Sequence, residues 1–173
     1  MGNMQTTSVK LYSLRYDELR TYLFAAAFAV GNIVFPQLCH AVPQGGVRFL
    51  PIYFFTLVGA YKYGWRVGML VAVLSPLVNS ALFGMPVAEN LPAILLKSVL
   101  IAGAAGVAAS RTGRISLPLT AAVVLFYQIV GTLGEWAMRG DLTLALQDFR
   151  IGIPGMLLQI FGGWAVIRYL LRR

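Results

Sequence analysis

A single lysine, Lys97, stands inside an otherwise apolar stretch of the chain at positions 91–109. An ammonium group in hydrocarbon is costly unless it is paired or hydrated, and such residues commonly mark a ligand or ion site. The alternative is that the side chain extends to the nearby membrane surface, because Lys97 lies about two turns from the start of the stretch. Lys97 is the strongest single indication of a polar site inside this protein.

A pair of polar residues in another apolar stretch points to the same kind of site. Ser75 and Asn79 stand four residues apart in the apolar stretch 61–86, so a helix places both side chains on one face. Polar groups in lipid-embedded helices turn away from lipid and towards a helix bundle or a cavity. We therefore expect a polar site inside a bundle of helices.

Residues for common enzymatic chemistry are scarce. The sequence has one histidine, six acidic residues, no Walker-type phosphate loop, no His-Glu-x-x-His zinc motif and no serine nucleophile elbow. General acid–base catalysis has few candidate groups, and we do not expect an enzyme. Cys39 and His40 offer ligands for a metal such as cobalt or haem iron. A lone pair of this kind in a loop is more often incidental, so we expect neither a metal site nor a cofactor.

The composition is that of a membrane protein. Of the 173 residues, 58% are hydrophobic and 12% are charged, whereas soluble domains carry about 25% charged residues. The net charge of +8 does not indicate nucleic-acid binding, because the basic residues stand at the ends of apolar stretches. There they set the membrane orientation and attract anionic lipid. One cysteine excludes an internal disulfide, and the polar first twenty residues predict no cleavable signal peptide.

The apolar stretches predict an all-α integral membrane bundle of six transmembrane helices. We expect a cytoplasmic tail at 1–20, disordered at 1–9 and forming a short interfacial helix at 10–20, followed by a single domain at 21–173. Each stretch approaches the roughly 20 residues that span a bilayer, and the second is the shortest. The six predicted spans are 21–38, 49–63, a helix within 61–86, 91–109, 117–137 and 151–170.

The basic residues predict the orientation of this bundle. Six spans put both termini on one side, and placing that side in the cytoplasm makes its short loops strongly basic. The opposite side then has Arg48, Arg139 and Arg150, offset by four acidic residues. The prediction is N-in, C-in. The cytoplasmic basic residues are Lys10, Arg15, Arg20, Lys62, Arg66, Arg111, Arg114, Arg168, Arg172 and Arg173.

This topology gathers polar and aromatic residues in the outer half of the bundle. We expect a pocket open to the outside that holds a small polar or amphipathic molecule. Several of the candidate residues also have ordinary structural explanations. Glu135 pairs with Arg139 on the surface, Arg48 and Arg150 mark the membrane boundary, and Gln159 forms a hydrogen bond to another helix. The candidate substrate-binding residues are His40, Arg48, Asn79, Lys97, Tyr127, Glu135, Trp136, Arg150 and Gln159.

The third predicted span resembles the S components of energy-coupling factor (ECF) transporters. In that family a GxxxGxxxGxxSPL…FGMP-like pattern is common. This chain matches it at Gly64, Gly68, 75–77 and 83–86, and has Ala72 in place of the third glycine. The chain length, the six predicted helices, the N-in, C-in termini and the outward pocket also agree with the family, so the resemblance covers nearly the whole chain.

Two further motifs extend the resemblance. The segment IPGMLLQ at 153–159 is similar to the family's Pro-Gly…Gln pattern, and Ala25 and Ala29 match its AxxxA signature on the first helix. Small residues at this spacing form a strip where another helix can approach closely. The resemblance assigns the strip to docking on a partner subunit, and the alternative is packing inside the same bundle.

The resemblance implies a function, partners and a location. S components capture a vitamin or related micronutrient from outside, under a loop that follows the first helix. They dock on a membrane T component that carries two cytoplasmic ATPases, and the bundle is thought to topple to deliver the solute inward. The implied location is the bacterial cytoplasmic membrane. The alternative is a small six-helix membrane scaffold of the rod-shape type, which needs no pocket.

The identity of the solute follows less directly from the sequence. Arg48, Lys97 and Arg150 favour a carboxylate or phosphate, as in pantothenate, folate or lipoate. The adjacent Cys39 and His40 keep a corrinoid or another tetrapyrrole as a minority option.

Overall fold

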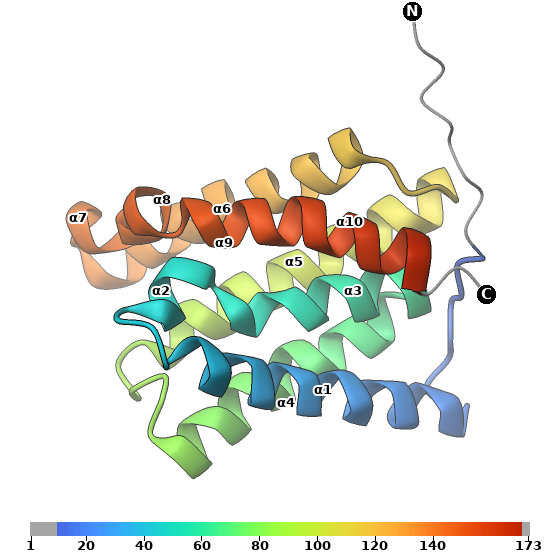
Figure 1. The fold of residues 1–173 in the computed structure, drawn as a ribbon, viewed down its shortest axis with the longest axis horizontal. Helices are drawn as coiled ribbons and strands as arrows, with labels where there is room; N and C mark the ends of the chain where they lie inside the picture. The colour runs from blue at the N-terminus through green and yellow to red at the C-terminus, as the bar shows by residue number, and fades with distance from the viewer. Residues whose placement is uncertain (1–9, 171–173) are drawn as a thin grey trace, which may run out of the picture.

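The computed structural model describes residues 10–170, and throughout this range the regular secondary structure is helical (Figure 1). Four helices are long and apolar enough to cross a membrane. The prediction of an all-α chain with membrane-length apolar helices is therefore confirmed. The four helices are α1 (Leu19–Cys39), α4 (Trp65–Phe83), α5 (Leu91–Thr112) and α6 (Leu117–Arg139).

The remaining helices are short or bent. The segments 142–151 and 153–169 meet at an angle of 56°, and they make a fifth membrane crossing if they are taken as one span. Between α1 and α4 lie α2 (Gly45–Phe49), the 3-10 turn η1 (Pro51–Tyr53) and α3 (Phe54–Tyr63). After α6 come α7 (Leu142–Ala145), α8 (Gln147–Ile151), α9 (Ile153–Leu157), the π-helical η2 (Leu158–Gly162), α10 (Gly163–Ala165) and the π-helical η3 (Val166–Leu170).

The second predicted span is shorter than a membrane crossing. Together η1 and α3 have 13 residues, which at about 1.5 Å per residue cover about 20 Å of a hydrocarbon core about 30 Å thick. Helix α3 lies at the centre of the bundle against α1, α4 and α5, and all its residues except Phe55 are buried. By length the structure supports four or five crossings, and the number six stays a prediction.

The chain runs back and forth between two ends of the bundle (Figure 1). At one end α1 begins, α3 turns into α4, α5 turns into α6, and the last helix finishes. We call this the basic end. The connections after α1, α4 and α6, together with α7 and α8, lie at the other end, which we call the cavity end.

Charge is distributed unevenly between the two ends. In the described range the basic end carries eight Lys or Arg and two acidic residues, whereas the cavity end carries four of each kind. The excess positive charge lies at one end, as the positive-inside pattern requires of a cytoplasmic face. The basic residues there are Lys10, Arg15, Arg20, Lys62, Arg66, Arg111, Arg114 and Arg168; Arg172 and Arg173 lie outside the described residues.

Residues 10–18 do not form the predicted interfacial helix. The backbone amide of Tyr12 donates to the Lys62 carbonyl at 2.8 Å, and the Tyr12 ring stacks on the Tyr63 ring with centroids 5.7 Å apart. The last carbonyls of a helix need donors from outside it, and this segment supplies them to α3. The tail predicted at 1–9 lies outside the described residues.

Two helices end at glycines beside the cavity end. Helix α4 ends at Gly84 and α6 at Gly140, with φ of 65° and 70°. This left-handed conformation is open to glycine and strained for most other residues. The glycine amides donate to the carbonyls of Ser80 and Trp136, at 3.0 and 2.8 Å. Both turns redirect the chain across the cavity end and so position the loops that line the site.

Candidate solute-binding cavity

A cavity of about 310 Å³ lies at the cavity end of the bundle. Its walls come from distant parts of the sequence: the end of α1, the segment from α2 to η1, the connection between α4 and α5, and the facing sides of α5, α6 and α8. One wall is mainly apolar and the other is charged. The lining residues are Pro36, His40, Gly46, Val47, Leu50, Pro51, Ile52, Tyr53, Asn79, Met85, Pro86, Val87, Asn90, Ala93, Ile94, Lys97, Glu135, Arg139, Leu144, Gln147 and Asp148.

Four charged side chains form a cluster on the wall made by α5, α6 and α8. The Lys97 Nζ atom lies 2.7 Å from Glu135 Oε2 and 2.6 Å from Asp148 Oδ2. The Arg139 Nε atom lies 3.3 Å from Glu135 Oε1. Buried charges are tolerated when they are paired in this way. Lys97 is 1% exposed, so its ammonium group is paired inside the bundle and does not extend to the membrane surface.

The packing of α5 against α6 fixes the position of Lys97. A Cβ atom at Gly131 would lie 2.5 Å from Lys97 Cγ, so the missing side chain makes room for the lysine methylene groups. Three residues further along α6, a Cβ atom at Gly134 would lie 2.4 Å from Leu96 Cδ2. Small residues let two membrane helices approach closely. Helix α5 is thereby held where its ammonium group forms part of the cavity wall.

Asn79 on α4 contributes a second polar feature to the lining. Its Nδ2 atom donates to the backbone carbonyls of Asn32 and Ser75, both at 3.0 Å. Because both partners are acceptors, the amide orientation is determined. The Asn79 Oδ1 atom is buried and has no hydrogen-bond partner within residues 10–170. An unpaired buried acceptor costs about 1–3 kcal/mol, which a ligand donating to this atom would recover.

A buried network supports Asn79 from the side of α1 and α3. The Asn32 Nδ2 atom donates to Thr56 Oγ1 at 2.8 Å and to Ser75 Oγ at 3.2 Å, and the Phe55 amide donates to Asn32 Oδ1 at 3.1 Å. These bonds join three helices next to the cavity. Ser75 and Asn79 are both buried, so the prediction that they face the interior of the bundle is confirmed.

Tyr127 and Gln159 stand behind the apolar wall. The Tyr127 hydroxyl donates to Gln159 Oε1 at 2.8 Å, and Gln159 Nε2 donates to the Leu50 carbonyl at 3.3 Å. The Tyr127 ring also packs against the Tyr53 ring, with centroids 5.4 Å apart. Leu50 and Tyr53 line the cavity. The two predicted residues therefore position lining residues without lining the cavity themselves.

The structure brings four of the nine predicted binding residues to the cavity wall. Trp136 is turned away because neighbouring positions on a helix point about 100° apart, and its neighbour Glu135 faces inward. Arg48 and Arg150 are exposed near the ends of the short helices α2 and α8. The four lining residues are His40, Asn79, Lys97 and Glu135.

Ala25 and Ala29 do not lie on the outer surface of the bundle. Their side chains are 2% and 8% exposed, because this side of α1 packs against α3 and α4. The prediction that they form a flat docking contact is wrong for this arrangement, and their small size instead allows close packing inside the bundle. Leu23, Ala27 and Val30 form part of the exposed side of α1.

Sequence patterns do not identify Tyr53, Arg139 and Asp148 as cavity residues. The i,i+4 spacing of Glu135 and Arg139 is a visible signal, but it fits a surface ion pair equally well. Asp148 is 51 positions from Lys97, and no local spacing connects the two. Tyr53 resembles any other aromatic residue of an apolar segment.

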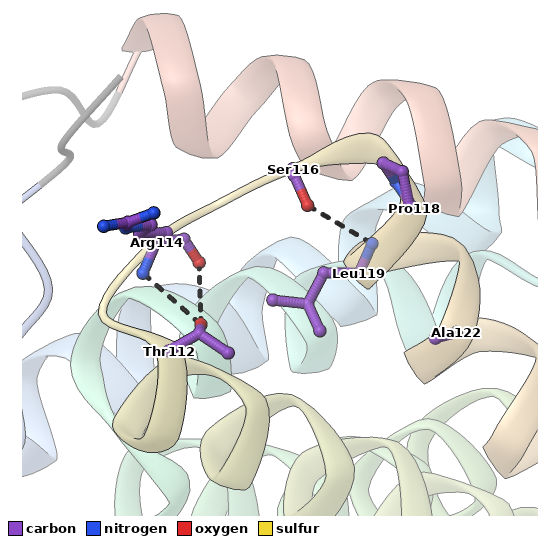
Figure 2. Close-up of a pocket in the computed structure, with 6 residues that line it drawn as sticks. All are labelled: Thr112, Arg114, Ser116, Pro118, Leu119 and Ala122. Carbon is purple, nitrogen blue, oxygen red and sulfur yellow. Dashed lines mark hydrogen bonds between the residues drawn. The ribbon is translucent and has the colours of Figure 1, made fainter. Parts of the chain in front are cut away.

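A second depression, of about 560 Å³, lies at the basic end where α5 turns into α6 (Figure 2). It is larger than the cavity, but it is a shallow surface feature and none of its six lining residues is buried. Its polar groups serve the turn: the Arg114 amide donates to Thr112 Oγ1 and the Leu119 amide to Ser116 Oγ, both at 3.4 Å. Ser116 acts as the N-cap of α6. We therefore place the candidate site at the cavity end.

Metal-ligating side chains are dispersed in the part of the chain that the structure describes. Within residues 10–170, no group of three or more His, Cys, Asp or Glu side chains is placed to hold a metal ion. Cys39 is buried in the bundle, while His40 is exposed and lines the cavity.

Comparison with known proteins yields no relative. No protein-family model matches the chain, and neither a curated protein nor a solved structure is similar to it.

Proposed function

We propose that the chain is the substrate-binding membrane subunit of an ECF-type importer, which captures a vitamin or related micronutrient at the cavity end. The observation that carries the proposal is a cavity walled by the paired ammonium of Lys97 and by Asn79, whose Oδ1 acceptor is buried and unpaired in the described chain. Leaving such a group unpaired costs stability. Five other buried side-chain atoms within residues 10–170 are also unpaired, but Asn79 is the one residue among them that lines the cavity.

The charge distribution supports an orientation with the basic end in the cytoplasm. The cavity then opens to the outside, as capture by an importer requires. Counting α3 and the bent C-terminal segment, six passages between the two ends would place both termini inside. The short α3 is compatible with this topology because irregular backbone is tolerated at membrane depth where protein surrounds it.

The size of the cavity supports a small solute. About 310 Å³ is at the lower end of the range of roughly 300–1,000 Å³ for small-molecule sites. A corrinoid or another tetrapyrrole is considerably larger, which disfavours the minority option raised by Cys39 and His40. The polar side chains on the cavity wall include those of the charged cluster, Asn79, His40, Asn90 and Gln147. Arg48 and Arg150 are not among the lining residues.

The proposal requires a T component and two ATPase subunits as partners. The resemblance places the contact with the T component on the first helix. Since Ala25 and Ala29 are buried, we assign the contact to the exposed side of α1, which includes Leu23, Ala27 and Val30.

The test is direct measurement of solute binding by the purified chain in lipid nanodiscs. Native mass spectrometry detects small molecules that copurify, and titration against a panel of vitamins follows. We expect Lys97→Met and Asn79→Leu each to weaken binding about tenfold or more, because both side chains line the cavity. The matched control Arg150→Gln changes an exposed residue at the same end and should keep the affinity. If no panel member binds more tightly than about 1 mM, the proposal fails and a scaffold without a solute is favoured.

A further inference from the structure

Asp148 joins the short segment made of α7 and α8 to the rest of the bundle. Its carboxylate lies 2.6 Å from Lys97 Nζ, and Lys97 is its sole ion-pair partner among residues 10–170. The segment 142–151 meets the following helix at 56°, with Gly152 at the junction. Asp148 therefore sits on a short helical segment next to a bend, whereas its partner sits within a 22-residue helix.

The other carboxylate of the cluster is held more firmly. Glu135 lies within the long helix α6 and is paired with both Lys97 and Arg139, at 2.7 and 3.3 Å. Asp148 is also the more exposed of the two carboxylates, with 18% of its side chain accessible against 12% for Glu135. Of the two carboxylates that pair with Lys97, Asp148 is therefore the one that a solute can replace.

The charge balance selects what can replace it. The cluster has two cations, Lys97 and Arg139, and two carboxylates. Without Asp148 it carries one uncompensated positive charge in a place where such a charge is costly, and one incoming carboxylate restores the balance. A cationic solute would have to displace the ammonium group of Lys97, whose methylene chain is packed against Gly131.

The other residues that line the cavity indicate which groups the rest of the solute should carry. Leu50, Pro51, Ile52 and Ile94 provide an apolar surface on the same cavity. Asn79 provides a buried acceptor that is unpaired in the described structure. A solute that satisfies both has an apolar body and a hydrogen-bond donor, in addition to its charged group.

We propose that Asp148 is a placeholder for the carboxylate of the solute: a small monocarboxylate with an apolar body displaces Asp148 from Lys97 and thereby removes the ion pair that links the segment 142–151 to α5. This inference rests on the proposed function, since it takes the occupant of the cavity to be a solute. No covalent bond changes in the exchange; one ion pair replaces another.

The experiment compares three probes of equal chain length on the full chain in nanodiscs: hexanoate, hexanamide and hexylammonium, with chloride as the salt control. The readout is the midpoint of thermal unfolding as a function of probe concentration, since a ligand of the folded state raises that midpoint. We expect hexanoate to half-saturate Asp148→Ala at a concentration about tenfold lower than the wild type, because the internal competitor is gone. For hexanamide and hexylammonium, the half-saturating concentration should not be lower in Asp148→Ala than in the wild type.

Two further variants make the result specific. Adding Lys97→Met to Asp148→Ala should abolish the hexanoate effect, while Glu89→Gln, which removes an exposed carboxylate at the same end, should behave as the wild type. If Asp148→Ala does not fold, Asp148→Asn takes its place. Hydrogen exchange of the wild type should increase in residues 142–151 when hexanoate is added.

Three outcomes would overturn the inference. They are equal hexanoate responses in Asp148→Ala and the wild type, a hexanoate effect that survives the loss of Lys97, and stronger stabilisation by hexylammonium. If the hexanoate experiment gives the expected result but no vitamin binds, the importer proposal is overturned and this inference stands. Vitamin binding that Asp148→Ala weakens would overturn this inference and leave the importer proposal standing.

Discussion

Replacing Lys97 with methionine removes the ammonium group that two carboxylates of the cavity cluster share. Glu135 keeps Arg139 at 3.3 Å, but Asp148 loses the ion-pair partner at 2.6 Å. Two carboxylates then remain in the cluster with Arg139 as its one cation. Removing one partner of a buried ion pair typically costs about 3–5 kcal/mol, because the remaining charge is left uncompensated.

The structure places the expected cost at the lower end of that range. The side chains of Glu135 and Asp148 are 12% and 18% accessible, so water solvates the orphaned charge in part. We therefore expect a loss of about 3 kcal/mol in the free energy of unfolding. For a chain of this length, that corresponds to a fall of roughly 6–12 °C in the unfolding midpoint.

A double-mutant cycle separates this effect from loss of packing. Asp148→Asn removes the charge that Lys97→Met leaves unpaired. The free energy of unfolding of the double variant should therefore fall by about 1–3 kcal/mol less than the sum of the falls in the two single variants. Unfolding in nanodiscs, followed by tryptophan fluorescence, measures all three variants, and Arg150→Gln serves as the exposed control. A Lys97→Met variant as stable as the wild type, with an additive cycle, would refute the buried cluster and favour a lysine that reaches the membrane surface.

Two further predictions concern helix packing around the site. Gly131→Ala would put a Cβ atom 2.5 Å from the lysine side chain, so we expect a loss of about 1–3 kcal/mol and weaker solute binding. Gly103→Ala meets its nearest atom at 3.6 Å and should cost nothing; equal effects in thermal unfolding would contradict the packing argument. Ala25→Trp inserts an indole into a buried site and should abolish a monodisperse peak in size-exclusion chromatography. Ala27→Trp should keep the fold and solute binding but reduce cellular uptake, and normal uptake would count against a partner contact on the exposed side of α1.

The class of the fold and the need of certain polar groups for partners can be predicted from the amino-acid order alone. A long uncharged stretch in lipid must satisfy its backbone hydrogen bonds internally, so it forms a helix. The same reasoning requires Lys97 to be paired or hydrated, and it places Ser75 and Asn79 together on an inward face. These inferences are local, and the structure agrees with them.

Which sides of the helices face one another, and which distant residues become partners, is visible in the folded chain and not in its sequence. In a soluble protein the apolar face of a helix marks the interior, but in a membrane the lipid-facing side is apolar as well. The sequence therefore did not distinguish the buried Ala25 and Ala29 from the exposed Ala27. Asp148 reaches Lys97 because the chain passes through α6, turns at its end and folds back over the cavity with a 56° bend. That contact depends on the path of the whole chain, and the physical requirement for a partner does not specify which residue supplies it.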